Sequence, residues 1–272
     1  GEVVGLWPAS AFDSAGKYYL SYRDVHQGQF PQQDWAASDM ELWEGTTLPP
    51  TTPVCLKAGG DDKKAWGGHQ QMTIGADDQP AVVSDQIQGS AAGDGAGVVF
   101  TRRNTDGTWT KAAVIFGVPN TQTGPSVAWD ATEGYGIAVI DASANELKYL
   151  RSLNGSSWNA PDEVYGQGTG GWYPTLAMDP INHEPAIAFY ICSPRSGVNE
   201  SSCTQAEDRL VVTQRIVGNW RETLVDEEGG YHPHLAFFAS GKKLVVYRQP
   251  TALDSAGHKV ANAGALKIAV RQ

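Results

Sequence analysis

The feature that most constrains the fold of this chain is a short pattern that recurs five times. Each copy is a strand-like apolar stretch that follows a proline or a glutamine. The copies are WPASAFD at 7–13, HQQMTIG at 69–75, GPSVAWD at 124–130, YPTLAMD at 173–179 and HPHLAFF at 232–238. From copy to copy, the second residue recurs after 62, 55, 49 and 59 residues. A period of this length indicates a repeat architecture in which each repeat is one supersecondary unit.

Further strand-like segments follow each copy in the same order. A short turn leads to a second apolar segment and then to a third, and in three repeats a turn that ends in tryptophan leads to a fourth. The second segments are YYLSYRD, PAVVSD, GIAVID, PAIAFYI and KLVVYR, and the three tryptophans are Trp109, Trp158 and Trp220. Four short strands in a repeat of about 50 residues are the blade pattern of a β-propeller. The sequence therefore predicts an all-β, five-bladed β-propeller.

The two ends of the chain can close this propeller. The fifth repeat reaches Gln272 after three strands, and GEVVG at 1–5 is similar to DEVYG at 162–166, the fourth strand of the third repeat. We therefore expect the N-terminal strand to complete the last blade, which removes an open sheet edge. The alternative is a fragment of a larger propeller. The expected single domain, 1–272, has blades near 6–60, 61–117, 118–167, 168–228, and 229–272 with 1–5.

The composition agrees with β-structure rich in turns and limits the partners. Glycine accounts for 31 of the 272 residues and charged residues for only 18 %, a combination that favours tight turns over exposed helices. The formal net charge of −10 argues against nucleic acid and anionic membranes as partners, since both require a basic surface. No apolar run reaches the roughly 18 residues of a membrane span. Because the chain begins at Gly1 without Met, it is interpreted as a mature or excised fragment.

Within the repeats, the pattern P-S-x-A-x-D, A-I-A-x-x-D, L-K-Y and G-x-W resembles the degenerate sialidase-type repeats (BNR, or Asp-box-like) of bacterial extracellular propellers. NTDGTW at 104–109 looks like a shortened Asp-box, and the resemblance implies that this motif pins a hairpin. Sialidases have six blades and an arginine triad that do not map onto five blades, so the resemblance does not imply sialidase activity. Five-bladed relatives by architecture include furanosidase-type glycosidases. In this chain, AFDSAGKYYLSYRD at 11–24 resembles the opening blade of those enzymes.

Loop lengths distinguish the two faces of the predicted propeller. Turns between the first and second strands are short, as in DSAG and ADDQ, and they share a side, the short-turn face, with the turns between the third and fourth strands. Connections between the second and third strands share the other side, the long-loop face, with the links between blades. The long connections are 24–38, 85–96, 190–208 and 249–264. Since function collects on variable loops held by a rigid scaffold, we expect the long-loop face to be functional and the short-turn face to be idle.

Three histidines suggest a metal site at the mouth of the central channel. His69 and His232 align in one column at the start of the first strands, where the other repeats have Trp7, Gly124 and Tyr173. His234 lies two residues after His232, on the same face of the strand. Three neutral imidazoles with an open position suit zinc or copper, so this column predicts one Zn or Cu ion. The alternatives are histidines that line a wet channel and a catalytic histidine without a metal.

Aromatic residues at the blade links give a second hypothesis. Five of them lie at or next to these links on the long-loop face, and His26 lies in a loop of the same face. The five are Trp7, Trp66, Trp172, Tyr173 and Tyr231. Flat rings stack on the apolar faces of sugars, and nearby polar groups bind the hydroxyls. The cluster therefore predicts a site for a glycan or another small molecule, with packing between blades as the alternative for each ring.

Charged residues at the ends of the second strands are candidates for catalysis. Asp24, Asp85 and Asp141 end these strands in the first three repeats, and Arg23 and Arg248 lie near the same strand ends. A glycosidase requires two carboxyl groups with separated pKa values across the scissile bond, and an arginine could bind an anionic substrate. Because the acids recur at one repeat position, capping of turns is the alternative.

Two of the three cysteines bracket a polar loop. Cys192 and Cys203 flank SPRSGVNESS and are predicted to form a disulfide across it, with inert thiols as the alternative. A disulfide implies an oxidising compartment, so we expect an extracellular or periplasmic location.

Three functions remain open at this point. The first is a secreted ligand-binding or carbohydrate-active propeller that uses the long-loop face and the channel mouth. The second is a metal-binding protein or metalloenzyme with the three-histidine site, and the third is a scaffold that binds another protein. The sequence leaves the choice between an enzyme and a binding module open.

Overall fold

The computed structural model describes most of the chain. The described residues are 4–25, 38–46, 54–57, 65–87, 97–110, 113–116, 124–141, 144, 146–166, 170–191, 209–227, 230–250, 255 and 264–271. Within them the chain forms β-strands and one 3₁₀ turn, Ala76–Asp78. Among these residues there is no helix with the length and apolar character of a membrane span.

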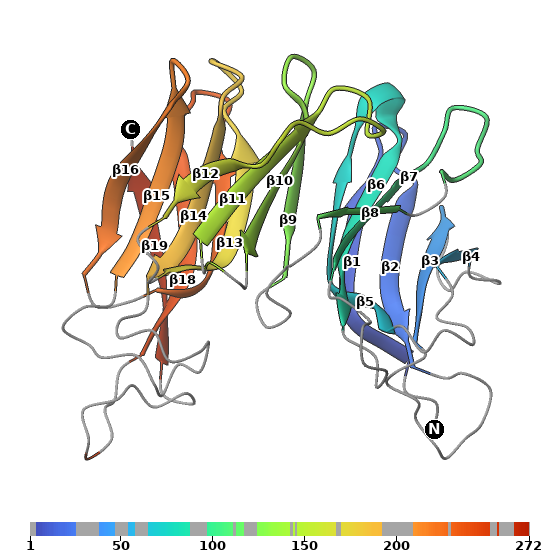
Figure 1. Ribbon diagram of the computed structural model, residues 1–272, viewed down its shortest axis with the longest axis horizontal. Coiled ribbons are helices and arrows are strands. Elements are labelled where there is room, and N and C mark those ends of the chain that lie inside the picture. The colour runs from blue at the N-terminus through green and yellow to red at the C-terminus, as the bar shows by residue number, and fades with distance from the viewer. Residues whose placement is uncertain are drawn as a thin grey trace. The chain divides into compact units, whose positions relative to one another are not determined.

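The strands fall into five antiparallel sheets that follow one another along the chain (Figure 1). The first sheet comprises β1 Val4–Phe12, β2 Tyr18–Asp24, β3 Asp39–Gly45 and β4 Val54–Lys57. The second comprises β5 Ala65–Ile74, β6 Pro80–Ile87, β7 Gly97–Arg102 and β8 Ala113–Phe116. The third comprises β9 Ser126–Asp130, β10 Gly134–Asp141, β11 Glu146–Ser152 and β12 Asp162–Tyr165. The fourth comprises β13 Gly170–Met178, β14 Pro185–Ile191, β15 Arg209–Ile216 and β16 Asn219–Asp226. The fifth comprises β17 Tyr231–Phe237, β18 Lys243–Pro250 and β19 Gly264–Arg271.

In every sheet, strands that are consecutive in the chain are also neighbours in the sheet. Each sheet is therefore a meander, and β1 begins at Val4, two residues before the start of the predicted first blade. The first strands of adjacent blades also pack against each other, β1 on β5 and β13 on β17. The fold is an all-β, five-bladed β-propeller, as the repeat predicted.

The chain divides into two compact units, which are described separately below. The first unit is Gly1–Trp129 with Ser152–Trp158, and the second is Asp130–Arg151 with Asn159–Gln272. Within the first unit, Val4 belongs to β1 and pairs with Asp24 of β2. Residues 1–3 lie outside the described residues, so the pairing of the N-terminal segment with the last blade stays a prediction.

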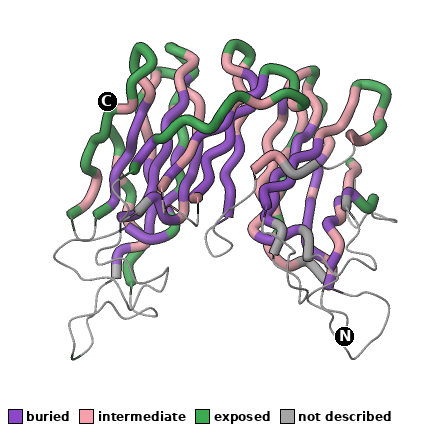
Figure 2. Tube along the Cα trace, viewed as in Figure 1, coloured by how far each residue is buried: buried purple, intermediate pink, exposed green. Residues whose placement is uncertain are grey.

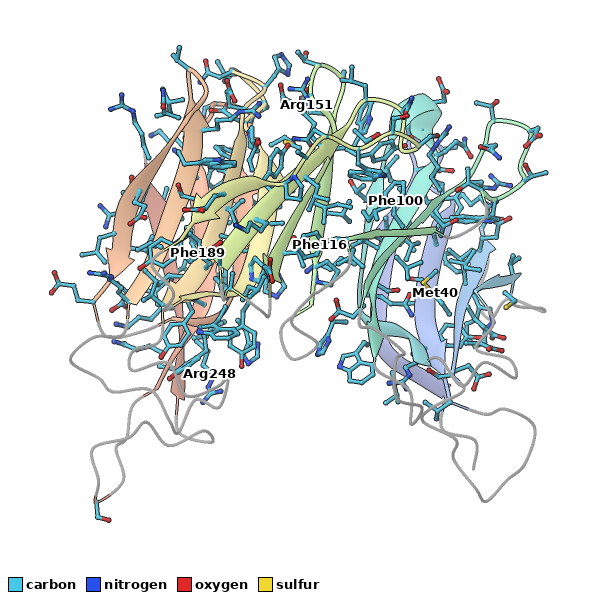
Figure 3. The ribbon with its side chains drawn as sticks, viewed as in Figure 1. Met40, Phe100, Phe116, Arg151, Phe189 and Arg248 are labelled. Carbon is cyan, nitrogen blue, oxygen red and sulfur yellow. The ribbon has the colours of Figure 1, made fainter. Side chains whose placement is uncertain are left out.

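The hydrophobic core lies between neighbouring sheets, and the middle strands of each sheet are the most buried (Figure 2). Every residue of β14 is buried, and every residue of β10 except Asp141. In the first unit, Met40, labelled in Figure 3, packs in one cluster with side chains of β2, β4, β6 and β7. A second cluster joins the fourth and fifth sheets through Leu210, Leu235 and Val245. Strands covered on both faces require continuous apolar runs, which explains segments such as PAIAFYI.

The three hairpin tryptophans join each blade to the preceding one. Trp158 packs edge-on against Phe100 of the second sheet, with ring centroids 5.0 Å apart, and Trp220 packs against Tyr149 of the third sheet at 5.4 Å. Trp109 packs against the core cluster of the first two sheets. The repeated tryptophans are therefore structural residues.

The shortened Asp-box forms a tight hairpin turn, as its resemblance implied. Asp106 Oδ1 accepts hydrogen bonds from the backbone N–H of Thr108, at 2.9 Å, and from its hydroxyl, at 2.6 Å. Gly107 has a φ of +85°, and its N–H donates to the carbonyl of Asn104 at 3.0 Å.

On the short-turn face, an aspartate ends the first strand of three repeats and binds the following turn. Asp13, Asp130 and Asp179 each accept hydrogen bonds from backbone N–H groups two to four residues later. Such Asx-type bonds favour turns over continued strand. The aspartate at the end of the WPASAFD-type pattern is therefore a structural residue.

A second contact of Asp130 predicts a pH-dependent contribution to stability. Asp130 Oδ2 lies 2.8 Å from His183 Nδ1, and this hydrogen bond and the charge of Asp130 raise the pKa of His183 above its usual value. Burial alone would raise the pKa of Asp130, but hydrogen bonds from His183, Glu133 and Thr132 lower it below its usual value. The ion pair therefore stabilises the fold at pH 5–6, where both groups are charged, and this contribution disappears as the pH rises through the pKa of His183.

We expect His183→Gln to lower the melting temperature more at pH 5.5 than at pH 8.5. Thermal unfolding of both proteins at the two pH values measures the difference, and 0.5 M NaCl should reduce it because the pair is partly exposed. An equal loss of melting temperature at both pH values would contradict the prediction.

Candidate functional site

At the long-loop end of the innermost strands, the five repeats share one unusual backbone conformation. The residues of the column identified from the sequence all have positive φ: Trp7 at 48°, His69 at 45°, Gly124 at 65°, Tyr173 at 53° and His232 at 48°. Four of them lie at a register shift of the first strand against the second. A left-handed conformation costs a residue other than glycine on the order of 1–3 kcal/mol, and such strain collects at functional sites. The column is therefore the first candidate for a site.

Within each unit, residues of this column contact one another. In the first unit, the rings of Trp7 and His69 lie 4.9 Å apart, and a Cβ built on Gly124 would lie 2.2 Å from His69 Cβ. In the second unit, the rings of Tyr173 and His232 lie 4.1 Å apart. Each unit thus has one pair of tilted rings that joins neighbouring blades, Trp7 with His69 in the first and Tyr173 with His232 in the second.

The column two residues further along also joins blades. Ser126 Oγ donates to Gln71 Oε1 at 2.8 Å, and the N–H of Leu235 donates to Thr175 Oγ1 at 3.3 Å. This column of small and polar residues therefore makes contacts where adjacent first strands meet.

Opposite the bulges, the second strands place one side chain each toward this end of the sheet. The pairs are Leu6 with Arg23, Gly68 with Asp85, Trp172 with Tyr190, and Tyr231 with Arg248. Asp85 therefore aligns with Arg23 and not with Asp24, which lies one residue later and pairs with Val4. This corrects the alignment of Asp85 with Asp24 that was read from the sequence, because Arg23 and Asp85 each lie 15 residues after Pro8 and Gln70, respectively, whereas Asp24 lies 16 residues after Pro8.

The most distinctive interaction of this region is between His69 and Asp85. Asp85 Oδ2 lies 3.2 Å from His69 Nδ1, and the side chains are 0 % and 24 % exposed, respectively. Burial raises the pKa of Asp85 to about 6, against the hydrogen bond from His69, which lowers it. The other carboxylate oxygen, Oδ1, is buried and has no hydrogen-bond partner among the described residues.

Arg23 also contacts Trp7. Its guanidinium carbon is 5.2 Å from the centroid of the indole, and its Nε donates to Ser38 Oγ at 2.6 Å. Burial lowers the pKa of Arg23 to about 10, so the side chain is still charged at neutral pH. Trp7, Arg23, His69 and Asp85 together form the group that we call the Trp7 cluster.

The predicted ligand-binding aromatic residues have different surroundings. Trp7 and Tyr173 are half-buried, whereas Trp172 is 2 % and Tyr231 is 1 % exposed. The hydroxyl of Tyr190 donates to that of Tyr231 at 2.9 Å, and their rings lie 4.3 Å apart. The contact of Tyr231 with Tyr190 of the preceding blade and the burial of both rings agree with the packing alternative, and ligand-binding roles for Trp172 and Tyr231 stay predictions.

Other predicted residues are only partly described. His26, Cys192 and Cys203 lie outside the described residues, as does the side chain of Trp66. The disulfide and the loop histidine therefore stay predictions.

The remaining charged candidates occupy separate positions. Asp141 Oδ1 accepts a hydrogen bond from the N–H of Ala144 at 3.4 Å, which agrees with the turn-capping alternative. Asp24 pairs with Asp39 of β3, and the guanidinium of Arg248, labelled in Figure 3, lies 5.9 Å from the ring of Tyr231. Catalytic roles for Asp24, Asp141 and Arg248 stay predictions.

The structure gives the predicted Zn or Cu site no support. Among the described residues, no group of three or more His, Cys, Asp or Glu side chains could hold a metal ion. His69 belongs to the first unit, and His232 and His234 belong to the second. His69 instead uses Nδ1 to bind a carboxylate.

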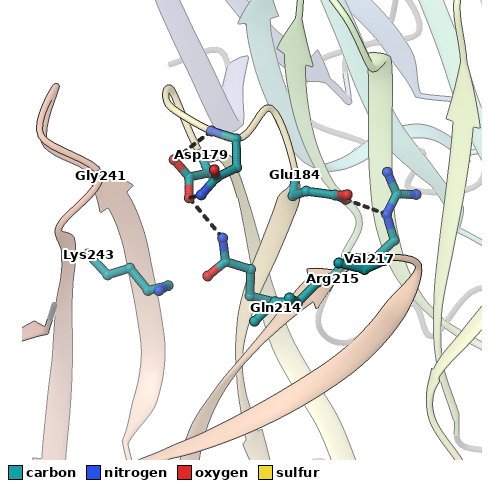
Figure 4. Close-up of a pocket in the computed structure, with 9 residues that line it drawn as sticks. Asp179, Glu184, Gln214, Arg215, Val217, Gly241 and Lys243 are labelled. Atoms are coloured by element: carbon teal, nitrogen blue, oxygen red, sulfur yellow. Dashed lines mark hydrogen bonds and ion pairs between the residues drawn. The ribbon is translucent and has the colours of Figure 1, made fainter.

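A cavity on the short-turn face of the second unit was missed by the sequence analysis, which took that face to be idle. It has a volume of about 490 Å³ (Figure 4). Its lining includes Asp179, Gln214, Arg215 and Lys243. Gln214 donates to Asp179 at 2.9 Å and Arg215 to Glu184 at 2.6 Å, so four of its polar side chains are paired with one another. The lining residues come from the fourth and fifth repeats, and only the packing of these repeats brings them together.

Comparison with known proteins places the fold. No protein-family model matches the sequence, and no curated protein matches it. Among solved structures, the α-L-arabinofuranosidase from Lactobacillus brevis matches with a TM-score of 0.50 at 9 % identity, over 99 % of this chain and 90 % of its own. The GH93 α-L-arabinofuranosidase of Fusarium graminearum, solved with arabinobiose, matches with a TM-score of 0.50 at 12 % identity, over 98 % of this chain and 92 % of its own. At these identities the similarity establishes the fold alone.

Proposed function

We propose that this protein is a carbohydrate-active β-propeller that binds its glycan on the long-loop face. The observation that carries the proposal is the Trp7 cluster, in which a half-buried indole contacts both a guanidinium and an imidazole. Glycan sites combine aromatic surface with a few fixed polar groups, and this cluster supplies both within one unit. The half-buried ring of Tyr173 beside His232 is a second aromatic surface of the same kind.

Two further observations support the proposal. The backbone of both Trp7 and Tyr173 is strained, and strain of this kind persists where a binding or catalytic geometry requires it. The two fold neighbours are named as α-L-arabinofuranosidases, and one was solved with arabinobiose. Arabinan and arabinobiose are therefore the first probes, followed by a broad glycan panel. An extracytoplasmic location is part of the proposal and rests on the predicted Cys192–Cys203 disulfide.

We expect Trp7→Ala and Tyr173→Ala each to weaken glycan binding at least about tenfold, equivalent to about 1.4 kcal/mol. Removal of an aromatic anchor from a binding site typically has an effect of this size or larger. Isothermal titration calorimetry of each variant with arabinan, arabinobiose and the panel measures the loss.

Phe12→Ala and Phe238→Ala are matched controls, because both rings are exposed and lie toward the short-turn face. These controls should bind within about twofold of the unmodified protein. The proposal is wrong if no glycan of the panel binds, or if the control variants weaken binding as much as the other two. Binding to another protein by the same face, with no glycan bound, would favour the interaction scaffold instead.

A further inference from the structure

The carboxylate of Asp85 serves one partner among the described residues. Its side chain is fully buried, Oδ2 contacts His69 Nδ1 at 3.2 Å, and Oδ1 has no partner in the described part of the chain. Burial of a carboxyl group costs free energy unless hydrogen bonds compensate for the lost water. A fold that keeps an incompletely satisfied carboxylate at this position therefore has a use for it beyond stability.

A second His–Asp pair in the same protein shows what a structural pair looks like. Asp130 contacts His183 at 2.8 Å, but its Oδ1 also accepts the N–H groups of Thr132 and Glu133. The His183 side chain is 44 % exposed at a turn. Asp130 thus stabilises a turn through backbone N–H groups in addition to its contact with His183. Among the described residues, the hydrogen-bond contact of the Asp85 carboxylate is with His69 alone.

The repeat itself shows that the carboxylate is specific to the second blade. At the register position of Asp85, the other sheets for which the pairing is known carry Arg23, Tyr190 and Arg248. His232 has the same backbone conformation as His69, but its sheet places Arg248 where the second sheet places Asp85. His69 is thus the histidine of this column whose own sheet places a buried carboxylate at this register position.

The ring of His69 is fixed from three sides. Nδ1 is held by Asp85, the indole of Trp7 packs against the ring at 4.9 Å, and Gly124 lies so close to His69 Cβ that a methyl group there would overlap it. An ionised carboxylate only accepts hydrogen bonds, so Nδ1 carries the proton and Nε2 carries the lone pair. A histidine whose tautomer is set in this way is the usual form of a catalytic base.

We propose that His69 is the proton-accepting catalytic residue of the carbohydrate-active site and that Asp85 is its positioning residue. This inference rests on the proposed function. The expected reaction is hydrolysis of a glycosidic bond. His69 Nε2 takes a proton from a water molecule as the water oxygen bonds to the anomeric carbon. The glycosidic C–O bond breaks with its electron pair on the departing sugar oxygen, which takes a proton from a solvent water molecule, and the imidazolium returns its proton to the hydroxide that this leaves.

The first test does not depend on activity. In protein labelled with ¹⁵N at histidine, two-bond ¹H–¹⁵N correlation spectra at pH 7.5 distinguish a protonated from an unprotonated ring nitrogen. We expect the His69 signals to show a protonated Nδ1 and an unprotonated Nε2, and Asp85→Asn to change this pattern. Signals assigned by comparison with His69→Gln that show a protonated Nε2 and a bare Nδ1 would overturn the proposal.

The second test separates this inference from the proposed function. Turnover and binding of arabinan and of the panel glycans are measured for the unmodified protein, His69→Gln, Asp85→Asn and the control His183→Gln. General base catalysis contributes roughly 10²- to 10⁴-fold. We therefore expect His69→Gln to lower kcat at least about 100-fold with KM within about threefold. Asp85→Asn should lower kcat at least about tenfold, and His183→Gln should leave both parameters unchanged.

Each outcome has one meaning. Turnover that survives in His69→Gln overturns the inference and leaves the proposed function standing. Glycan binding by the unmodified protein without any turnover also overturns the inference and leaves a binding module. A failure of every glycan to bind or react overturns the proposed function and the catalytic role together.

Discussion

Trp172→Ala is expected to lower the free energy of unfolding by about 3–5 kcal/mol, the usual cost of removing a buried large aromatic side chain. Trp172 is 2 % exposed and is one of the largest fully buried side chains in the described residues. The adjacent residue, Tyr173, is half-buried and stacks on His232. Tyr173→Ala should therefore cost about 1 kcal/mol or less, while it weakens glycan binding.

Urea unfolding followed by fluorescence and by far-UV circular dichroism measures the difference between these two neighbours. For a chain of this length, a loss of 3–5 kcal/mol corresponds to a decrease of roughly 6–20 °C in melting temperature. Trp172→Phe is the control, because it keeps a buried ring and removes an indole N–H that has no partner among the described residues. It should lose at most about half as much stability. If Trp172→Ala weakened glycan binding and left stability unchanged, Trp172 would be a ligand-binding residue after all.

Gly124→Ala is expected to destabilise the first unit by about 2–4 kcal/mol and to displace His69. Gly124 has a φ of +65°, and an added Cβ would lie 2.2 Å from His69 Cβ and 3.2 Å from the carbonyl oxygen of His69. The left-handed conformation costs alanine about 1–2 kcal/mol, and the overlap with Cβ and backbone forces one of the two strands to move. Both effects act at Gly124, which lies against His69, the proposed base.

Gly16→Ala separates the two effects, because Gly16 has a φ of +80° but no atom within 4 Å of an added Cβ. This control should cost only the conformational part, about 1 kcal/mol. Urea unfolding gives both values, and the ¹⁵N spectra of the His69 ring report whether its pairing with Asp85 survives in Gly124→Ala. Equal losses of stability in the two variants would mean that the contact between Gly124 and His69 is loose.

The repeat made much of the fold predictable, because a blade needs the same residue types at the same places each time. Apolar runs such as PAIAFYI specify strands covered on both faces, and a tryptophan after each hairpin turn specifies the contact with the preceding blade. The sequence also showed the column of strained residues, because four of its members directly precede a proline and the fifth, His69, directly precedes Gln70. The column comprises Trp7, His69, Gly124, Tyr173 and His232. The predicted column shares one backbone conformation in all five repeats.

Pairs of residues across strands were less predictable. His69 and Asp85 were both singled out in the sequence, but for different roles, one as a metal ligand and one as a possible turn cap. They are equidistant from Asp77, in the turn between β5 and β6, and a hairpin built around that turn brings them together. The equal distance from Asp77 was the one sequence feature that could have predicted the contact between His69 and Asp85. A regular hairpin register does not extend to His69, because the register shifts between Gly68 and Gln71.

The sequence by itself determined the class of fold, the number of blades and the position of the strained column, because these depend on local strand patterns and on the repeat. The tertiary structure alone decided which side chains at and next to that column are exposed and could contact a ligand. Trp172 and Tyr173 are neighbours in the chain with similar rings, yet packing between blades buries the first and leaves the second half-exposed. The pairing of β5 with β6 placed Asp85 beside His69. Burial and register are properties of packed sheets, so no single repeat carries the information that fixes them.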